Sequence, residues 1–405
     1  MSAPTQLQPP ASPTYILRGH ASPIHALHIF HQNLRLISGD ADGWVIVWDL
    51  VFKRPVAVWK AHEGAILEVK GFSFSNEIVT EVYTHGRDHK LCVWRFRAQD
   101  EDLLQKTLPV DMREQQQSQA TQPWLVHSLP VNALNFCAFS MLFLDNQTAP
   151  DASDAQPPGR ASLFAVPNAL DSGAIDLFHL PRERRLCTIP AGTAAQTGMV
   201  MAVALFYSSS RELHVAAAYE DGQVMVFARR GAQDFSGNAI SWKWEKVYVA
   251  RPHSQPALSI DVFPAGGYFV SSSADALLVR HPVPGFGETT TLKTVDTKHS
   301  GQQGLRIRSD GRVFATAGWD SRIRVYSCKT MRELAVLKWH KEGCYAVAFA
   351  DVVGFDVSGG TATTTKGDGE FSLATVQRQR NQKVQKTHWL AAGSKDGKIS
   401  LWDIY

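Results

Sequence analysis

Histidine, hydroxyl and carboxylate side chains recur together along this chain in a grouping that could carry out hydrolysis. The first such set consists of His20, Ser38 and Asp42. In a hydrolase triad the histidine takes the proton of the hydroxyl while the carboxylate orients the imidazole. A second set follows with His62, Thr84 and Asp88. Because a catalytic site is needed once whereas this grouping repeats, we interpret it as structural and expect the chain not to be an enzyme.

One further arrangement could suggest a metal site. His25, His28 and His31 are spaced by three residues. In a strand this spacing places successive side chains on opposite faces, so the three imidazoles cannot converge on one ion. The chain has no glycine-rich phosphate loop followed by lysine, no metalloprotease histidine pair and no Cys-x-x-Cys motif. We therefore predict no metal and no cofactor.

These polar residues belong to a longer repeated unit, in which an apolar run leads into a tight turn and then a short strand that ends in an aromatic residue. The residues that close these strands are Trp48, Trp94, Phe178, Phe227, His281 (a degenerate copy), Tyr326 and Trp402. Six residues before them stand Asp42, Asp88, Ser172, Asp221, Asp275, Asp320 and Asp396. The upstream histidines are His20, His62, His253, His299 and His340, with His127 as the candidate in the third copy. Repeats of about 43 residues with these landmarks are typical of WD-repeat propeller blades.

The repeat suggests why such polar residues would be buried together. In the WD-repeat family that the copies resemble, the turn Asp accepts from the loop His, the His bonds to a hydroxyl of the second strand, and that hydroxyl meets the indole N–H of the third-strand Trp. Such a chain of bonds satisfies every buried polar group in it. The first predicted tetrad is His20, Ser38, Asp42 and Trp48. The second is His62, Thr84, Asp88 and Trp94.

The repeats predict an all-β fold, a seven-bladed WD-repeat β-propeller. Only three residues follow Trp402, so the seventh copy lacks a fourth strand, and residues 15–18 are the unassigned candidate. We expect this N-terminal strand to close the ring, which removes an open sheet edge. The predicted organisation is a disordered tail over 1–13 and a single propeller over 14–405. Disordered inserts are expected near 99–122, 145–160, 229–241 and 354–388.

Composition limits the class of protein. Apolar residues make up 44% and charged residues 20%, as in ordinary soluble domains. The first residues have neither a basic start nor an apolar core, so we expect no secretory signal, and the sequence has no run of about 18 apolar residues that could span a membrane. A net charge of +3 gives no reason to expect direct nucleic-acid binding. We interpret the cysteines as reduced thiols of a nuclear or cytosolic protein; they are Cys92, Cys137, Cys187, Cys328 and Cys344.

One basic cluster lies in the last insert, at Arg378, Arg380, Lys383 and Lys386. The simplest interpretation is a solvated disordered loop. A nuclear-import signal and a contact with an anionic partner are the alternatives.

The inserts are distributed unevenly between the two faces of the predicted propeller. Each internal insert follows a first or a third strand, so all lie on one face, and the other face keeps short turns on which binding residues commonly sit. Those turns carry the candidate partner-binding residues Trp44, Arg87, Trp319 and Lys395. Trp and Arg are enriched at interface hot spots. The alternative is that each indole packs over a neighbouring blade.

The amino-acid sequence of several copies resembles that of a known family. These segments are 314–326 (FATAGWDSRIRVY), 390–396 (LAAGSKD) and 84–91 (THGRDHKL). They look like the fungal ASTRA-associated protein 1 family, which is similar to the animal G-protein β-subunit-like protein 1. The resemblance covers blades 1, 2, 6 and 7, is weaker in blades 3 to 5 and is absent in the inserts.

The resemblance implies a non-enzymatic interaction scaffold. It implies a subunit of the ASTRA complex, a large nuclear assembly linked to chromatin remodelling and to maturation of phosphatidylinositol-3-kinase-like kinases. Its partners would be protein subunits, without a membrane or direct nucleic-acid contact, and its location the nucleus, with the cytoplasm as a second site.

Other WD-repeat adaptors are the competing interpretation. A substrate receptor of a cullin ubiquitin ligase would carry Arg two residues after the Trp-Asp pair, but Val51 and Tyr405 stand there. A heterotrimeric G-protein β subunit would need a long N-terminal coiled-coil helix, and residues 1–13 are short and proline-rich.

Overall fold

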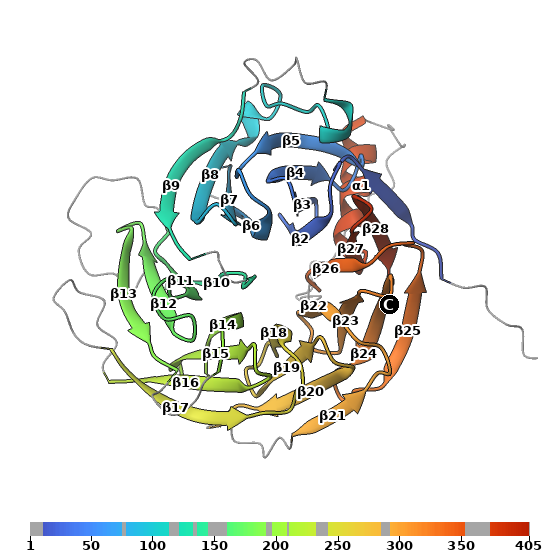
Figure 1. Ribbon diagram of the computed structural model, residues 1–405. Helices are drawn as coiled ribbons and strands as arrows, with labels where there is room; N and C mark the ends of the chain where they lie inside the picture. Colours follow the sequence, from blue (N-terminus) through green and yellow to red (C-terminus); the bar gives the residue numbers. More distant parts are fainter. Residues whose placement is uncertain are drawn as a thin grey trace, which may run out of the picture.

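Seven four-stranded antiparallel sheets form a ring in the computed structural model (Figure 1). The structure describes residues 11–74, 78–112, 121–132, 136–144, 160–191, 197–208, 210–231, 242–284, 292–352 and 373–404. This arrangement confirms the predicted seven-bladed all-β propeller.

Each blade runs from an inner to an outer strand. Blade 1 contains β2 (Ile24–Phe30), β3 (Arg35–Asp40), β4 (Trp44–Asp49) and β5 (Arg54–Lys60). Blade 2 contains β6 (Ile66–Phe74), β7 (Val79–Gly86), β8 (Lys90–Arg97) and β9 (Trp124–Pro130). Blade 3 contains β10 (Ser140–Phe143), β11 (Ser162–Pro167), β12 (Ile175–Leu180) and β13 (Arg184–Ile189). Blade 4 contains β14 (Val200–Tyr207), β15 (Leu213–Tyr219), β16 (Val224–Arg230) and β17 (Lys243–Ala250).

The remaining blades follow the same order. Blade 5 contains β18 (Ala257–Val262), β19 (Tyr268–Ser273), β20 (Leu277–Pro282) and β21 (Lys293–Asp296). Blade 6 contains β22 (Gln302–Ile307), β23 (Val313–Gly318), β24 (Arg322–Ser327) and β25 (Glu333–Lys338). Blade 7 contains β26 (Cys344–Phe349), β27 (Trp389–Ser394), β28 (Lys398–Asp403) and, from the N-terminus, β1 (Tyr15–Arg18).

The N-terminal strand closes the ring as predicted. β1 pairs antiparallel with β28, with Tyr15 opposite Leu401. Just before β1, the Thr14 N–H donates to the Leu401 carbonyl at 2.7 Å. Leu17 is 1% exposed and belongs to the apolar cluster between blades 7 and 1. The closing strand is therefore part of the core.

Strand β4 shows why the strands are apolar along their whole length. Its odd-numbered side chains Val45 and Val47 pack toward blade 2, in the cluster that holds Ile66. Its even-numbered Ile46 and Trp48 pack in the cluster shared with blade 7. Both faces of a blade are covered by its neighbours, so alternation between polar and apolar residues disappears.

The predicted polar tetrad is confirmed in blade 2. The His62 Nδ1 lies 2.8 Å from Asp88 Oδ1, and its Nε2 lies 2.7 Å from Thr84 Oγ1. The Trp94 indole donates to the same hydroxyl at 3.0 Å. His62 is 2% exposed, so these groups stabilise the blade and offer no access to a substrate.

In blade 1 the prediction that Asp42 accepts from His20 is wrong. His20 bonds Ser38 as expected, at 2.7 Å, but its Nδ1 meets Asp40 Oδ2 at 2.7 Å. Asp42 lies exposed at the tip of the turn. The cause is the residue that ends the second strand: Gly86 holds this position in blade 2, where any Cβ would lie 2.3 Å from the His62 ring. In blade 1 Asp40 fills the position and supplies the acceptor itself.

Other blades vary the tetrad. In blade 5, Ser271 Oγ bonds His253 and His281 at 2.8 Å each, so an imidazole replaces the indole. In blade 7, the hydroxyl that meets His340 and Trp402 is Ser400 on the third strand.

Two predicted upstream histidines are not tetrad members. His127 lies on β9 and bonds Glu183 at 2.6 Å. His299 is half-exposed and 3.7 Å from Asp320, which instead accepts from Arg324 at 2.6 Å.

The blade 1 network makes a testable prediction. Asp40→Ala removes the acceptor of His20 and of the Asp42 and Trp44 N–H groups, so we expect a loss of about 1–3 kcal/mol of unfolding free energy. Asp42→Ala at the exposed tip should cost less than about 0.5 kcal/mol. Denaturant melts of the two variants measure the difference. Equal losses would contradict the assignment of Asp40.

The segment after β8 is ordered over 99–112, so the expectation of a disordered insert there is wrong. It forms the 3₁₀ turns η1 (Ala98–Asp100) and η2 (Pro109–Asp111) and runs back along blade 1. The Val58 N–H donates to the Gln105 carbonyl at 2.8 Å, and Val110 N–H to that of Gly19 at 3.2 Å. A Cβ at Gly19 would lie 2.6 Å from the Leu108 side chain, so the close contact depends on glycine.

The other predicted inserts have mixed outcomes. Residues 373–386 form the single α-helix of the described residues, α1 (Leu373–Lys386), where disorder was expected. Strand β16 extends through Arg230 into the expected 229–241 insert. Most of 145–160, with 1–10 and 353–372, lies outside the described residues. Within the described chain, no helix is long and apolar enough to cross a bilayer, and no cluster of three or more His, Cys, Asp or Glu could hold a metal ion.

Candidate protein-interaction face

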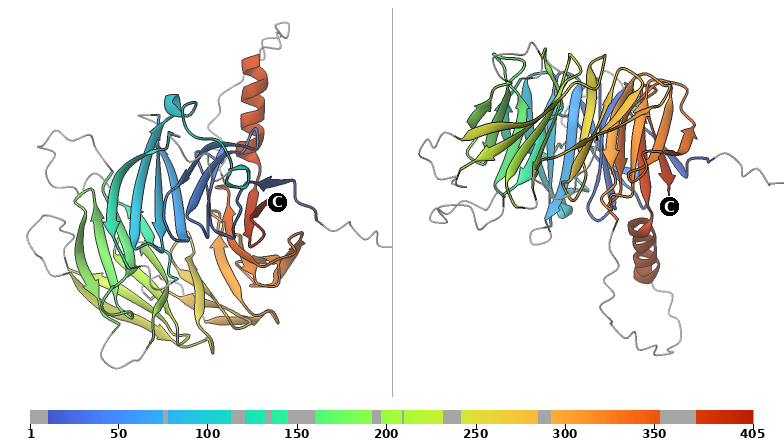
Figure 2. Two further views of the ribbon diagram at one scale, coloured as in Figure 1. Left: turned by 45° about the horizontal axis from the view of Figure 1, so that its top comes forward. Right: turned by 90° about the horizontal axis from the view of Figure 1, so that it is seen from below.

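The propeller has two faces with different connections. We call the surface formed by the turns between second and third strands, together with the links between blades, the turn face. The opposite surface, the insert face, carries α1, which projects from it in Figure 2. All four predicted partner-binding residues lie on the turn face, on four consecutive blades. In ring order they are Trp319 on blade 6, Lys395 on blade 7, Trp44 on blade 1 and Arg87 on blade 2.

Backbone hydrogen bonds hold these turns in place. The Arg87 N–H donates to the Ala65 carbonyl at 2.9 Å, joining the turn to the link that enters the same blade. The Trp319 N–H makes the equivalent bond to Gly301 at 3.0 Å. The turns are therefore fixed before any partner binds, which lowers the entropic cost of association.

Trp319 is the most accessible of the predicted aromatic residues. It is 47% exposed, and its indole N–H donates to Gln303 Oε1 at 2.9 Å. Its ring lies against Gly301, where an added Cβ would be 2.1 Å from Cε3. One side of the indole is seated on the backbone and the rest is open to a partner.

Arg87 forms a second accessible group with a residue that the sequence did not single out. Its guanidinium lies 4.5 Å from the centre of the Phe136 ring, in a cation–π contact between blades 2 and 3. Phe136 is 58% exposed. The third copy has few of the repeat landmarks, so nothing in the sequence indicated that this phenylalanine would lie at the surface beside Arg87.

The other two predicted residues are weaker candidates. Trp44 is half-buried and packs on the apolar cluster between blades 7 and 1, which fits the packing alternative. Lys395 lies 3.9 Å from Glu342, and both side chains are more than half exposed. An exposed pair of this kind contributes little to stability.

A repeated bulge adds a ring of side chains around the centre of the turn face. In six of the described inner strands the pairing register shifts after the first residue. The residues at these bulges all line the central cavity; they are His25, Leu67, Met201, Leu258, Gln303 and Tyr345. His25 and Tyr345 meet edge to face at 5.6 Å. A bulge turns one extra side chain toward the opening on each blade, and it leaves no clear signal in the sequence.

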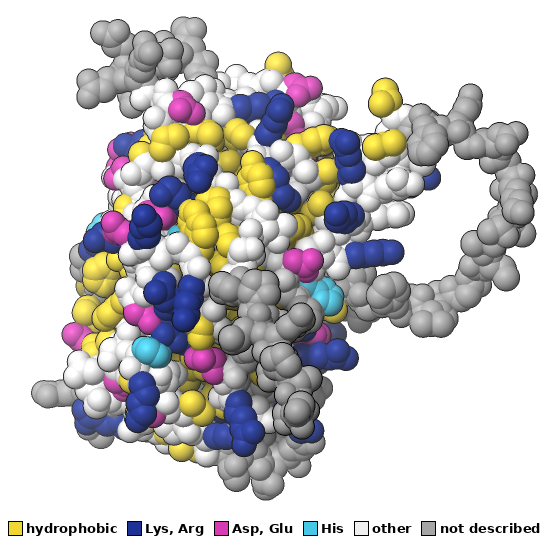
Figure 3. Space-filling view, turned by 90° about the vertical axis from the view of Figure 1, so that its right-hand side faces the viewer, with side chains coloured by type: hydrophobic (Ala, Val, Ile, Leu, Met, Phe, Trp, Pro, Cys, Tyr) yellow, Lys and Arg dark blue, Asp and Glu magenta, His cyan; other side chains and the backbone are white. Residues whose placement is uncertain are grey.

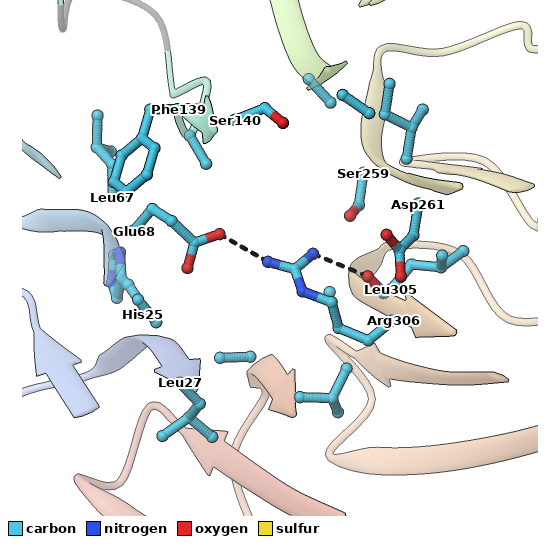
Figure 4. Close-up of a pocket in the computed structure, with 18 of the residues that line it drawn as sticks. His25, Leu27, Leu67, Glu68, Phe139, Ser140, Ser259, Asp261, Leu305 and Arg306 are labelled. Atoms are coloured by element: carbon cyan, nitrogen blue, oxygen red, sulfur yellow. Dashed lines mark hydrogen bonds and ion pairs between the residues drawn. The ribbon is translucent and has the colours of Figure 1, made fainter. Parts of the chain in front are cut away.

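The central cavity has a volume of about 380 Å³ and is crossed by an ion pair (Figure 4). Arg306 of blade 6 donates to Glu68 Oε2 of blade 2 at 2.7 Å. The Asp261 carboxylate accepts from the Ile307 N–H at 2.6 Å. Burial raises the pKa of Asp261, with Arg306 opposing the shift. Burial likewise lowers the pKa of Lys70 beside them, with Glu68 opposing the shift.

The Arg306–Glu68 pair joins blades 6 and 2, which are not neighbours in the ring. The Lys70 Nζ lies 3.9 Å from the same Glu68 carboxylate, so Glu68 faces both cations of the cavity.

The comparisons with known proteins agree on one family. The sequence model of ASTRA-associated protein 1 matches residues 13–402. The chain is 81% identical to the ASTRA-associated protein 1 of Aspergillus flavus over 430 residues, covering all of both chains. It is 64% identical to that of Aspergillus niger over 436 residues, covering 100% of this chain and 99% of the other. It is 31% identical to that of Schizosaccharomyces pombe over 428 residues, covering 97% and 99%. The chain therefore belongs to the ASTRA-associated protein 1 family.

Proposed function

We propose that this protein is a non-enzymatic subunit of the ASTRA complex that holds a protein partner on its turn face. The observation that supports the proposal most is the pairing of exposed anchors with fixed turns. Trp319, Arg87 and Phe136 are exposed, and backbone hydrogen bonds hold the turns that carry Trp319 and Arg87. Hot spots of protein interfaces are rich in Trp and Arg that become fully desolvated in the complex.

The wider role rests on the family. Its relatives carry the name ASTRA-associated protein 1, which motivates membership of that assembly. We extend the proposal to a nuclear assembly that is linked to chromatin remodelling and to maturation of phosphatidylinositol-3-kinase-like kinases. In such an assembly a rigid propeller would position other subunits through its surface.

One other surface has the composition of a docking site. A groove of about 620 Å³ lies at the outer edge of blade 2, where the end of β8, residues 100–104 and residues 121–126 meet. Trp124 (82% exposed) and Leu103 (69%) line it. This outer-edge groove is the natural comparison for the turn face, because it also presents an exposed indole.

Tagged protein purified from fungal extract tests the proposal. We expect Trp319→Ala and Arg87→Ala each to cost about 2 kcal/mol of binding free energy, which is roughly a 30-fold loss of affinity for the co-purifying ASTRA subunits. Melting temperatures should stay within a few degrees of the parent, because both residues are exposed. Trp124→Ala is the matched control and should retain the subunits. Retention by the two turn-face variants would argue against this face.

A further inference from the structure

The C-terminal end of helix α1 is held against the propeller by hydrogen bonds and apolar packing. Asn33 Nδ2, from the first loop of blade 1, donates to the Gln385 carbonyl at 3.1 Å. The Trp389 indole donates to the Val384 carbonyl at 3.1 Å, and Val384 is 8% exposed within the cluster between blades 7 and 1. The last turn of the helix is therefore part of the core, while its first turns project from the disc (Figure 2).

The loop beneath the helix has an unusual backbone. His31, Gln32 and Asn33 have φ angles of 53°, 51° and 65°. Non-glycine residues rarely adopt this left-handed conformation. Asn33 is 1% exposed, accepts from the Asp351 N–H at 2.9 Å and donates to its carbonyl at 2.8 Å. Its hydrogen bonds to both 351 and 385 fix the position and direction of α1.

The basic residues all lie on the open side of this helix. At about 100° per residue, the covered side is marked by Gln377, Asn381 and Val384, which fall within about 60° of one another. The exposed basic residues span about 200° on the opposite side, with exposed glutamines between them. The polar and basic residues of this open side are Thr375, Arg378, Gln379, Arg380, Gln382, Lys383 and Lys386, and Val376 lies among them. Figure 3 shows Lys and Arg side chains standing clear of the body where this segment leaves it.

The charge on α1 is of one sign. The helix contains no Asp or Glu. Lys383 and Lys386 in its last turn complement the helix dipole. Arg378 and Arg380 precede that turn and gain little from it. Across the described residues, no carboxylate lies within ion-pair distance of Arg378, Arg380 or Lys383. Arg378, Arg380 and Lys383 are thus held in place without an ion-pair partner among the described residues.

The side chains on the open side indicate what would bind. The side carries no aromatic or Met residue; its one apolar residue is the half-buried Val376, and the exposed Leu373 lies just beyond its margin at the first residue of the helix, so a protein groove would gain little apolar burial along the rest of it. It offers instead Arg, Lys and Gln, which donate to phosphates and to base edges. Arg378 and Arg380 stand at its two margins, so the charges face two directions rather than one flat surface. Two phosphate walls on either side of a helix are the geometry of a DNA major groove.

We propose that α1 binds duplex DNA by entering the major groove, with its basic residues on the phosphates of both walls. An α-helix about 10–12 Å across fits the B-form major groove, which is about 12 Å wide. The major groove of A-form RNA is too deep and narrow for it. The net charge of +3 gave no reason to expect this, because an overall sum does not report a local concentration of charge. DNA binding at α1 is independent of protein binding at the turn face.

Fluorescence anisotropy with a labelled 20-base-pair DNA duplex tests the proposal on the full chain. The variant replaces four residues by glutamine: Arg378→Gln, Arg380→Gln, Lys383→Gln and Lys386→Gln. Each phosphate contact contributes about 0.9 to the slope of log affinity against log salt, so the variant should lose up to about 3.6 from that slope. At low salt its affinity should fall at least about tenfold. An RNA duplex of the same length should bind the parent more weakly than DNA does.

A control of equal charge separates the helix from the protein's overall charge. It carries Arg18→Gln, Lys90→Gln, Arg184→Gln and Lys341→Gln, all at exposed positions away from α1. The proposal expects the control to bind DNA within about twofold of the parent. Equal losses in the two variants, or no loss in the α1 variant, would overturn it. Tighter α1-dependent binding to polyglutamate than to DNA would also overturn it and make an acidic protein the partner.

Discussion

Deletion of residues 2–18 should prevent the propeller from folding, whereas deletion of 2–12 should leave its stability nearly unchanged. The longer deletion removes β1 and exposes the edge of β28 along its register from Lys398 to Leu401. It also removes Leu17, and loss of a buried leucine side chain alone costs about 2–5 kcal/mol. With the strand hydrogen bonds at about 1 kcal/mol each, the total approaches the whole stability of a typical domain, about 5–15 kcal/mol.

The shorter deletion provides the control. It stops before the Thr14 N–H bond to Leu401 and leaves every β1 pair in place. Circular dichroism melts of both proteins measure the difference, and the longer deletion should show no cooperative transition at the parent's temperature. Coincident melts would mean that β1 does not close the ring.

Acid should unfold the protein between about pH 6 and pH 4. Burial lowers the pKa of His85 to about 3, of His179 to about 4 and of His281 to about 3. The folded state keeps these rings neutral, whereas the unfolded chain protonates them below about pH 6.5. Stability is therefore present above that pH and is lost as the pH falls toward the folded-state values.

The size of this effect follows from the pH difference. Between pH 6.5 and pH 5, each neutral buried ring lowers the free energy of unfolding by about 2 kcal/mol, at 1.36 kcal/mol per pH unit. Three rings together lose about 6 kcal/mol, which is comparable to the stability of a domain. Burial opposes the low pKa of Asp396, but the interaction with His340, 3.5 Å away, lowers it to about 2, so protonation of Asp396 should weaken the fold further below about pH 4.

Chemical denaturation of the parent and of His281→Gln at pH 7 and pH 5 tests the histidine account. Glutamine keeps a polar group beside Ser271 but does not titrate. The loss of unfolding free energy between the two pH values should shrink by about 2 kcal/mol in the variant. The same loss in both proteins would show that His281 is not linked to acid unfolding.

The fold was predictable because its repeats carry redundant landmarks. Six of seven turn aspartates stand in register, so the blade count did not depend on any single copy. The choice between Asp40 and Asp42 could not be made in this way. Asp40 and Asp42 are only two residues apart, and the outcome depends on whether the residue that ends the second strand carries a carboxylate of its own, as Asp40 does and Gly86 and Ser273 do not.

The face, but not all of the site, could also be predicted. The order of strands alone decides on which face of the ring a turn lies. It therefore placed Arg87 and Trp319 on the same face. Exposure of Phe136 and the ring of bulge residues depends on contacts between blades, which leave no periodic signal. Helix α1 was not predicted because one of the hydrogen bonds that hold it comes from Asn33, more than 300 residues away in sequence. Its own composition, rich in Gln, Arg and Lys, is also that of a solvated loop.

Binding of ASTRA subunits to three purified forms of the protein tests the central claim most directly. The forms are the parent, a turn-face variant and an outer-edge variant of blade 2. The turn-face variant carries Arg87→Ala, Phe136→Ala and Trp319→Ala. The outer-edge variant carries Arg97→Ala, Leu103→Ala and Trp124→Ala, at three residues that line the groove at the outer edge of blade 2.

Each folded form should be immobilised at equal density and exposed to fungal extract, and the retained subunits should be quantified by mass spectrometry. We expect the amount of ASTRA subunits retained by the turn-face variant to fall at least about 30-fold, while the outer-edge variant retains them at the parent's level. The opposite result, with the subunits lost from the outer-edge variant and retained by a stable turn-face variant, would contradict the central claim.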